Sequence, residues 1–514
     1  MMVFWAYVWS TDHVWEDFFI TFKFSENLAS GRGLVYGPGQ AAHGFTSPIG
    51  TLLPAVFHLL AGSPEANPWP ALWMFRGVSS LALATAVGIV YVALRRSTRH
   101  ATFAMLGSIL LLLDAKSVVF AASGMESAFM ALFCAVMLLS ISLETRRAMW
   151  CMVVAFAGLQ LTRPDGVVYS AAFVIALWLV DRRKWLLTSL RAAALAVLIY
   201  MPWFVFAWTY YGSPIPNTAR AKAATLIFEP RFDPALSWYA NIQALCSRAL
   251  DIAQQLFMPA MAGFGGWPNW LWWWATMAAG LAVVMPVYFL IARQSRQSLS
   301  HTSVIAGLVT VFAIVYFVFA PGPSAWYLPH VTLMAIASMT GLLSYAALRH
   351  RKLAIATVMF MVFVQAIGLV QSTRQLAVQQ KLIETATRTE IGRWLNQHTP
   401  PDATIFLECL GYVGYHARRP MFDYPGLARP EVWHQIRARR LRFRRLAEHF
   451  QCDYMVLRPV EWQQIRAMSN GFAERYEKVY EVNRLAEVEA LPASIWGKDY
   501  LRHDAAFVVL RRVR

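Results

Sequence analysis

Long apolar segments alternate with short polar loops through most of the chain. Between residues 71 and 370 these segments are roughly 14 to 26 residues long, close to the 20 or so with which a helix crosses a bilayer. The pattern therefore predicts an α-helical polytopic membrane protein. The predicted spans are residues 71–94, 101–115, 125–143, 148–162, 167–180, 186–211, 270–292, 303–320, 331–348 and 353–370.

Two shorter apolar stretches precede these spans. Residues 1–10 are too few to cross a bilayer, so they either lie at the interface or belong to a longer helix that begins upstream. Residues 49–61 are apolar for about a dozen positions, which favours a helix lying in the membrane interface. A span there would also place the basic loop 95–100 on the side opposite to the basic loops that follow, against the positive-inside rule.

Basic residues mark one side of the predicted membrane region. When the spans are counted in this way, the short basic clusters between them all fall on one face, which the positive-inside rule assigns to the cytoplasm. The long loops and the hydrophilic region after residue 371 then lie on the outer side, where we expect any chemistry to take place. The clusters are residues 95–99, 146–147, 182–184, 293–296 and 349–352.

Composition supports the membrane assignment and limits the kinds of molecule that the protein is expected to bind. Of the 514 residues, 57% are hydrophobic and only 15% are charged, which is too apolar for a soluble protein of several domains. The net charge of +17 does not indicate nucleic acid, because the cations fall in short interspan clusters and the tail, with no nucleic-acid motif. Membrane lipids explain this charge. The five cysteines show no metal-binding spacing, so no metal site is predicted.

The region from residue 372 to 514 is predicted as a soluble α/β domain that follows a membrane module of residues 1–371. Helical and strand patterns alternate there, as is typical of such domains. The arginines between residues 437 and 445 form a solvated face or a surface for anionic lipid or polymer. Cys409 and Cys452 could pair. The predicted elements are helices 374–397 and 430–450 and strands 403–408, 454–458, 476–482 and 505–510.

The first outer loop, within residues 11–70, contains the most unusual polar segment. Glu16 and Asp17 open a predicted helix over residues 16–30, in which Asp17, Thr21 and Ser25 form one polar stripe on an otherwise aromatic surface. This stripe is expected to face a cleft, and Asp17 lies where the helix dipole favours a negative charge. Alternatively, the two acids only cap an interfacial helix.

Other polar side chains lie near the predicted outer ends of the spans, where ionisable groups are costly and suggest a function. For the segment LTRPDG the alternative is a local salt bridge that caps a turn. The alternative for the segment YYGSPIPNTARAKAA is that its cations only extend toward the membrane interface. The alternative for AWYLPH is that its aromatic residues belong to an interfacial belt. These motifs contain the candidates Arg163, Asp165, Asn217, Arg220, Lys222 and Tyr327, and ASGMES adds Glu126.

The run EDFFITFKFSENLASGRGLVYGPGQAAHGFTSPIGTLL resembles the first extracytoplasmic loop of bacterial GT-C glycosyltransferases, especially the cell-wall arabinofuranosyltransferase branch (terminal β-arabinofuranosyltransferase-like). That branch reads DDAFISFRY and later G-[YF]-T-[SN]-P-L-W. Here Glu16 replaces the first Asp, Lys23 stands where Arg is usual, and Gly50 stands where Trp is usual. The motifs LTRPDG, ASGMES and YYGSPIPNTARAKAA are similar to motifs of the same branch. The resemblance extends from residue 15 to about residue 431.

The resemblance implies a GT-C-like fold with about eleven transmembrane helices, the first truncated here, and a C-terminal extracytoplasmic α/β domain. It implies transfer of a sugar from a polyprenyl-phosphate donor to an extracytoplasmic glycan, lipid or protein acceptor. The location would be the bacterial inner membrane, with the active site outside. No cofactor would be required, although some members of the wider superfamily use a divalent cation.

The same resemblance assigns roles to the candidate residues. Asp17 aligns with the second acid of the family's DD pair and would be the general base, which Glu16 would orient unless it binds a sugar hydroxyl. Lys222, Arg220 or Arg163 would stabilise the charge on the departing phosphate. The other candidates for donor phosphate or substrate binding are Asp165, Asn217, Glu126, His43 and Tyr327.

Two other functions fit parts of the pattern. A transporter or flippase for a lipid-linked glycan would need the same groove and cations but no base, and its broken helices and paired repeats are not visible in the sequence. A polymer-binding assembly protein would use the membrane part only as an anchor. Loss of all function on removal of the exported domain would favour the assembly protein.

Overall fold

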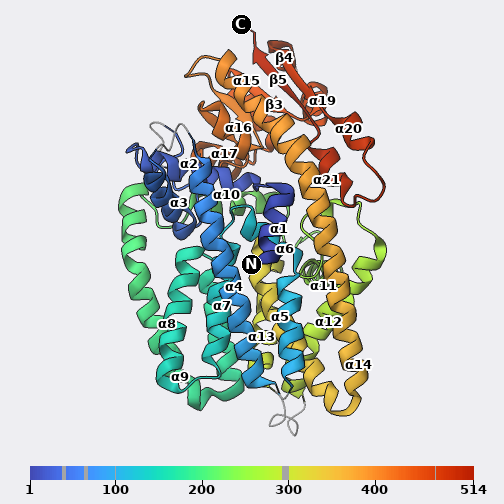
Figure 1. Cartoon of the computed structure of the whole chain (residues 1–514). Coiled ribbons are helices and arrows are strands. Elements are labelled where there is room, and N and C mark those ends of the chain that lie inside the picture. Colours follow the sequence, from blue (N-terminus) through green and yellow to red (C-terminus); the bar gives the residue numbers. More distant parts are fainter. Residues whose placement is uncertain (38–41, 63–66, 99, 292–299, 469–470, 514) are drawn as a thin grey trace.

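Helices run side by side in the lower part of the molecule, and a small sheet with its helices is stacked on their upper end (Figure 1). The computed structural model describes the chain except for residues 38–41, 63–66, 99, 292–299, 469–470 and 514. The basic cluster predicted at residues 293–296 lies outside the described residues. The C-terminus lies at the top of the sheet, and the N-terminus lies near the upper end of the bundle.

The bundle confirms the prediction of an α-helical membrane fold. In the described part of the chain, five helices are long and apolar enough to cross a membrane, or six if the bent pair α5 and α6 forms one span. The bundle helices are α4 (Trp69–Ser97), α5 (Ala101–Leu112), α6 (Ala115–Ala122), α7 (Ser127–Ser140), α8 (Thr145–Thr162), α9 (Gly166–Tyr211), α12 (Asn269–Ile291), α13 (His301–Phe319) and α14 (Pro329–Val378).

Two of these helices turn back on themselves. The backbone leaves the helical conformation at Asp181 in α9 and at His350 in α14. Figure 1 shows both reversals at the end of the bundle opposite the sheet. Each helix therefore contains two of the predicted spans. The predicted total of about eleven counts the two halves of α9 and of α14 as separate spans. It also includes α1, α7 and α8, which are not among the five helices that satisfy the length and composition test.

The predicted spans 101–115 and 125–143 leave residues 116–124 between them as an outer loop, but most of this stretch is a buried helix, so its prediction as a loop was wrong. Asp114 caps the start of α6, and Lys116 is buried with its ammonium group donating to the carbonyl of Leu256 at 2.9 Å. The two charged residues satisfy each other and the backbone inside the protein, which their polarity alone did not indicate.

Shorter helices lie at the upper end of the bundle. The helix α2 (Glu16–Ala29) has nearly the predicted bounds, and so does α3 (Pro48–Ala61). Along α3, Leu59 and Leu60 are exposed while His58 is buried, as expected of a helix with one lipid-facing side. The others are α1 (Met2–Thr11), α10 (Asn217–Thr225), the 3-10 helix η1 (Leu226–Phe228), α11 (Trp238–Gln255), and the 3-10 helices η2 (Ala262–Phe264) and η4 (Ala325–Tyr327).

The C-terminal region contains a five-stranded sheet of order β2-β1-β3-β5-β4. The first three strands in this order are parallel, and β5 is antiparallel to both β3 and β4. The predicted α/β pattern is confirmed, although the three-residue strand β2 was not predicted. The strands are β1 (Ile405–Leu407), β2 (Met421–Asp423), β3 (Tyr454–Leu457), β4 (Tyr476–Asn483) and β5 (Ala506–Arg512).

The helices of this region pack around the sheet. The predicted helix 430–450 is two helices, because Arg440 adopts a left-handed conformation with φ 54° between them. The helices are α15 (Glu390–His398), α16 (Leu410–Ala417), α17 (Pro430–Arg439), α18 (Phe443–Phe450), α19 (Pro459–Met468), the 3-10 helix η6 (Ala473–Arg475), α20 (Leu485–Glu489) and α21 (Lys498–His503).

No break in the helix marks the predicted boundary after residue 371. The helix α14 continues into the π-helix η5 (Gln379–Thr389) and then into α15. One hydrophobic cluster also joins the two regions, since Ile20 and Phe24 of α2 pack with Ile405 of β1 and Val413 of α16. The sheet is thus held directly against the helix that carries Asp17, while the division into two domains stays a prediction.

A glycine permits a close approach between these two regions. A Cβ atom at Gly411 would lie 2.1 Å from the carbonyl oxygen of Glu16. Gly411→Ala should therefore push α16 away from α2 and lower the free energy of unfolding by about 1–3 kcal/mol. Thermal unfolding of the purified protein in detergent measures this change.

Gly77 in α4 provides the matched control, because no atom lies within 4 Å of a Cβ atom built there. Gly77→Ala should leave stability unchanged or raise it by about 0.4–1 kcal/mol, as expected for alanine in a helix. Equal unfolding temperatures for the two variants would contradict tight packing at Gly411.

Candidate functional site

The start of α2 places both predicted acids where the bundle meets the C-terminal region. The backbone N–H of Trp15 donates to the carbonyl of Ser123 at 2.9 Å, and the buried Phe18 anchors the first turn in the core. Glu16 and Asp17 are both half-buried. Consecutive residues of a helix are turned by about 100° from each other, so the two carboxylates face different surroundings.

Asp17 makes no hydrogen bond or ion pair with any described residue. Burial raises the pKa of Asp17 above its ordinary value, the cation of Lys222 opposes this rise, and the anion of Glu126 adds to it. A carboxylate that is partly withdrawn from water and has no donor of its own has a high affinity for a proton. A general base needs such proton affinity, and the assignment of that role to Asp17 stays a prediction.

Among the charged groups around Asp17, Lys222 has the largest electrostatic effect on its pKa. Its Nζ donates to the hydroxyl of Tyr327 at 2.8 Å and lies 5.6 Å from the ring centroid of Trp326. Burial alone lowers the pKa of Lys222, but Tyr327 and Asp17 outweigh it and raise this pKa. The side chain therefore stays charged in an aromatic setting, where a cation can attract an anionic group.

Arg163 holds the other side of Tyr327. Its guanidinium lies 3.7 Å from the ring centroid of Tyr327 and forms ion pairs with Glu126 at 2.8 Å and Asp165 at 2.9 Å. The predicted local salt bridge with Asp165 is present, and Glu126 extends it. Three segments far apart in the sequence thus converge, but two carboxylates already neutralise Arg163, which leaves Lys222 with more unbalanced charge.

Arg220 and His43 lie in a second group. Residues two apart on a helix face different ways, so Arg220 cannot share the orientation of Lys222. The Arg220 guanidinium donates to the hydroxyl of Ser213, and the imidazole of His43 stacks on Tyr211 with centroids 4.7 Å apart. Burial, reinforced by the cation of Arg220, lowers the pKa of His43 to about 4.

Asn217 connects α10 to the C-terminal region. Its amide nitrogen donates to the carbonyls of Gly426 at 2.6 Å and Leu427 at 2.7 Å, and its amide oxygen accepts from the indole N–H of Trp433. These bonds engage both donor hydrogens of the side chain. Asn217 therefore fixes the start of the helix that carries Lys222.

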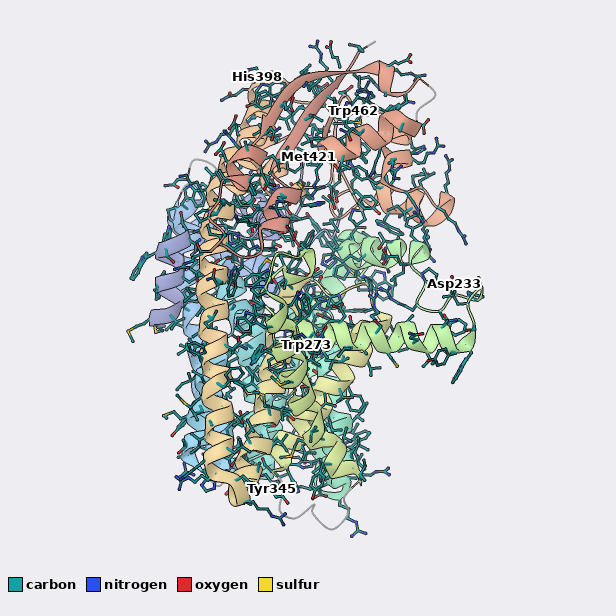
Figure 2. All side chains as sticks on the ribbon, turned by 90° about the vertical axis from the view of Figure 1, so that its right-hand side faces the viewer. Asp233, Trp273, Tyr345, His398, Met421 and Trp462 are labelled. Atoms are coloured by element: carbon teal, nitrogen blue, oxygen red, sulfur yellow. The ribbon has the colours of Figure 1, made fainter. Side chains whose placement is uncertain are left out.

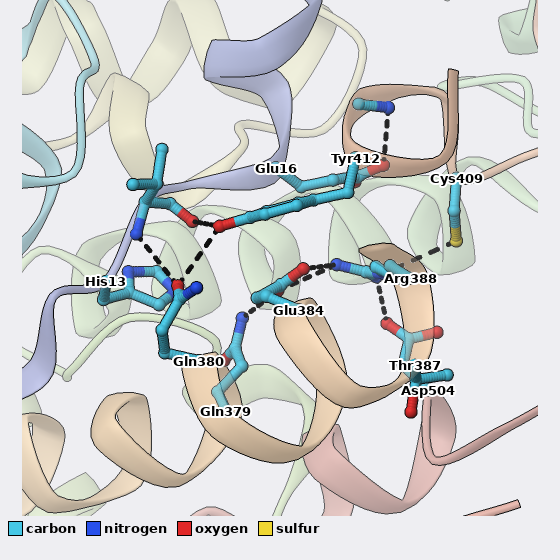
Figure 3. A network of polar contacts seen from close by, with 12 residues as sticks. His13, Glu16, Gln379, Gln380, Glu384, Thr387, Arg388, Cys409, Tyr412 and Asp504 are labelled. Carbon is cyan, nitrogen blue, oxygen red and sulfur yellow. Dashed lines mark hydrogen bonds and ion pairs between the residues drawn. The ribbon is translucent and has the colours of Figure 1, made fainter. Parts of the chain in front are cut away.

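Glu16 faces the C-terminal region (Figure 3). Its carboxylate accepts a hydrogen bond of 3.0 Å from the backbone N–H of Gly411. Burial raises the pKa of Glu16 to about 8, the cation of Arg388 opposes this rise, and Asp17 adds to it. Glu16 and Asp17 are neighbouring acids, each with a raised pKa, and they titrate as a coupled pair.

Beyond Glu16 lies a buried network of charges, shown in Figure 3. Arg388 on η5 donates to both carboxylate oxygens of Glu384 at 2.9 Å and to Asp504 at 2.6 Å. Asp504 also accepts from the Nε of Arg458 at 2.7 Å. Burial alone would raise the pKa of Asp504. The guanidiniums of Arg388 and Arg458 outweigh this effect and hold the pKa below its ordinary value. The network joins the end of α14 to the sheet.

Sequence reasoning missed this network. Its only local signal is the spacing of Glu384 and Arg388 by four residues, which also occurs on many solvated helices. Asp504 lies 116 residues from Arg388. Two further side chains of this region are in internal contacts, since Tyr412 donates to the carbonyl of Val14 at 3.0 Å and Asp423 accepts from the N–H of Ala428 at 3.0 Å.

The five cysteines form no disulfide bond. Cys409 and Cys452, which could have paired, are both buried free thiols, and the Sγ of Cys409 lies beside the Arg388 and Arg458 guanidiniums instead. Among the described residues, no group of three or more His, Cys, Asp or Glu side chains has an arrangement that could hold a metal ion. Whether a divalent cation takes part stays a prediction.

Comparison with known proteins gives the fold. The structure is similar to ArnT from Cupriavidus metallidurans bound to undecaprenyl phosphate, with a TM-score of 0.55 and 14% identity over 99% of this chain and 96% of that one. For the apo state of ArnT the TM-score is 0.56, again with 14% identity, over 99% and 95% of the two chains. The chain has a GT-C-like fold.

A more distant similarity is to the Archaeoglobus fulgidus oligosaccharyltransferase in complex with Zn and sulfate. Here the TM-score is 0.50 and the identity 12%, over 91% of this chain and 68% of that one. Residues 374–503 match the model of a domain of unknown function, DUF8728. No curated protein matches the chain. The resemblance to the arabinofuranosyltransferase branch stays a prediction.

The buried network should control stability. Arg388→Gln leaves Glu384 and Asp504 buried without their shared cation, which should lower the free energy of unfolding by about 3–5 kcal/mol. The exposed pair of Arg502 and Glu489, 2.7 Å apart in the same region, supplies the control. Arg502→Gln should change stability by about 1 kcal/mol or less, because water screens exposed pairs. Chemical unfolding of both variants in detergent measures the difference, and similar losses would contradict a special role for the network.

Proposed function

We propose that this protein is a membrane glycosyltransferase that transfers a sugar from a polyprenyl-phosphate donor to an extracytoplasmic glycan, lipid or protein. The observation that carries the proposal is the half-buried, unpaired Asp17 near the Lys222–Tyr327 pair. Sugar transfer needs a base for the acceptor and a cation for the phosphate, and we assign these roles to Asp17 and Lys222. The fold shared with an ArnT structure that holds undecaprenyl phosphate supports a lipid-linked donor.

The proposed reaction proceeds by displacement at the anomeric carbon. An acceptor hydroxyl loses its proton to the Asp17 carboxylate as its oxygen bonds to the anomeric carbon. The bond between that carbon and the phosphate oxygen breaks, and the polyprenyl phosphate leaves with the bonding electrons. Lys222 stabilises the charge that develops on the phosphate, and the hydroxyl of Tyr327 is placed to assist.

The surrounding residues then position this pair. Arg163, fixed by Glu126 and Asp165, holds the ring of Tyr327, and Asn217 fixes the start of α10. Arg220 and His43 would contact a more distant part of a substrate. The scheme requires no cofactor, and a divalent cation is compatible with it.

The proposal includes a location and a class of sugar. We place the protein in the bacterial inner membrane, with the acids of α2 and the C-terminal α/β region outside the cytoplasm, because the short basic loops indicate the opposite face. The motifs shared with the arabinofuranosyltransferase branch favour a pentose or hexose donor. The acceptor would be part of the cell envelope or cell wall.

Reconstitution tests the function directly. Purified protein in lipid vesicles is offered radiolabelled polyprenyl-phosphate pentoses and hexoses with oligosaccharide acceptors, and labelled product is expected with at least one donor. Movement of the lipid-linked sugar across the vesicle without transfer from any donor would replace the transferase by a flippase.

Asp17→Asn should lower the transfer rate by a factor of about 10² to 10⁴, because it keeps the shape of the side chain but removes its basicity. Thermal stability should equal or exceed that of the unchanged protein, since burial penalises the ionised Asp17. Transfer by the unchanged protein should fall as the pH drops through the raised pKa of Asp17. Transfer rates at a series of pH values measure the first and third effects, and thermal unfolding in detergent measures the second.

Two controls accompany this variant. Glu16→Gln should reduce transfer less, because the Glu16 carboxyl is engaged by the N–H of Gly411, and a glutamine side-chain oxygen can accept the same hydrogen bond. Asp402→Asn, at an exposed turn, should leave the rate unchanged. Near-normal transfer by Asp17→Asn would remove Asp17 from the proposed role and make Glu16 the next candidate.

Lys222→Ala should raise the KM for the donor by roughly 10- to 100-fold, since a hydrogen bond to a charged group contributes about 1.5–3 kcal/mol. It should also move the acid limb of the pH profile upward, because Lys222 lowers the pKa of Asp17. Arg220→Ala, on the same helix but facing another way, should not move that limb. Loss of stability with unchanged donor KM and pH profile would make Lys222 structural.

A further inference from the structure

The helix α11 projects sideways from the bundle. Figure 2 shows it extending outward toward Asp233, at the level of Trp273 on α12. Of its 18 residues only Asn241 and Ile252 are buried. The helix is therefore attached mainly near its C-terminal end, and most of its surface has no protein partner within the described part of the chain.

The exposed surface of this helix has an apolar side. Trp238 and Tyr239 are 72% and 73% exposed, and Leu250 is 50% exposed. At about 100° per residue, these positions share one half of the helix with Ile242 and the exposed thiol of Cys246. The opposite half consists mainly of polar side chains, namely Gln243, Ser247, Asp251, Gln254, Gln255 and Arg248.

Exposed aromatic residues continue from α11 onto the neighbouring bundle. Trp270 and Trp273, at the outer end of α12, are 42% and 74% exposed. Tryptophan and tyrosine gather where a bilayer meets water, because their rings are amphipathic. The arm formed by α11 thus extends a band of interfacial residues away from the bundle.

We propose that α11 lies in the outer membrane interface, with the side that carries Trp238, Tyr239 and Cys246 turned into the lipid. The partner is a lipid surface of no particular charge, because Arg248 and Asp251 are the only charged side chains on α11 and have opposite signs. The arm anchors residues 226–237, which follow the helix that carries Lys222, at the membrane surface. This inference does not depend on the proposed reaction.

A spin label at two adjacent positions tests the orientation of the arm. Cys246 lies about 80° from Trp238 around the helix, on the apolar side, whereas Ser247 lies about 180° away. The full chain carries Cys151→Ala, since Cys134, Cys409 and Cys452 are buried. One sample keeps Cys246 for labelling, and the other combines Cys246→Ala with Ser247→Cys. Both are placed in phosphatidylcholine nanodiscs that hold one copy of the chain.

Relaxation of the label by oxygen and by a soluble nickel complex gives the result. Oxygen concentrates in lipid and the nickel complex stays in water, so the label at position 246 should respond at least threefold more to oxygen, relative to nickel, than the label at 247. Equal ratios at the two positions would overturn the proposal. A label at 246 that nickel reaches in one-copy discs but not in two-copy discs would assign this face to a second copy of the chain, and would also overturn it.

Discussion

The burial of two neighbouring acids between a membrane bundle and a sheet is the constraint on which this structure depends. Carboxylates lose favourable hydration when they leave water, so each buried one needs a partner or gains affinity for a proton. The two acids meet this condition differently. Glu16 accepts the N–H of Gly411 and lies within the field of Arg388, whereas Asp17 is left without a hydrogen-bond donor. Close contact between α2 and α16 imposes this difference, and Gly411 makes that contact possible.

The cations at the upper end of the bundle are unequal for a related reason. Arg163 contacts Glu126 and Asp165, so its charge is already balanced inside the protein. Lys222 donates to the hydroxyl of Tyr327 and has no carboxylate ion pair among the described residues, so it retains attraction for an additional anion. Arg163 and Lys222 are alike as candidate phosphate ligands in the sequence. In the structure Arg163 supports its neighbours, whereas Lys222 keeps a charge that could attract an anion.

The C-terminal region directly supports the residues around Glu16 and Lys222. The helix α14 continues through η5 into it, Arg388 on η5 pairs with Asp504 beside the sheet, and Asn217 binds the loop that follows β2. The same region therefore supports Glu16 from one side and the helix of Lys222 from the other. A shift of the C-terminal region against the bundle would therefore displace both Glu16 and the helix of Lys222, because each is bonded to backbone atoms of that region.

The sequence by itself determined the membrane class, most helix positions, the α/β character of the C-terminal region and the segments that contain Asp17, Arg163 and Lys222. These features follow from hydrophobic runs and local motifs, which fix structure over a few turns of chain. Only the tertiary structure decided that residues 115–122 form a buried helix, that Asn217 holds the C-terminal region, and that Arg388 and Asp504 meet. Such contacts join residues more than a hundred positions apart, so the distances and burial that set their charges and partners exist only once the chain has folded.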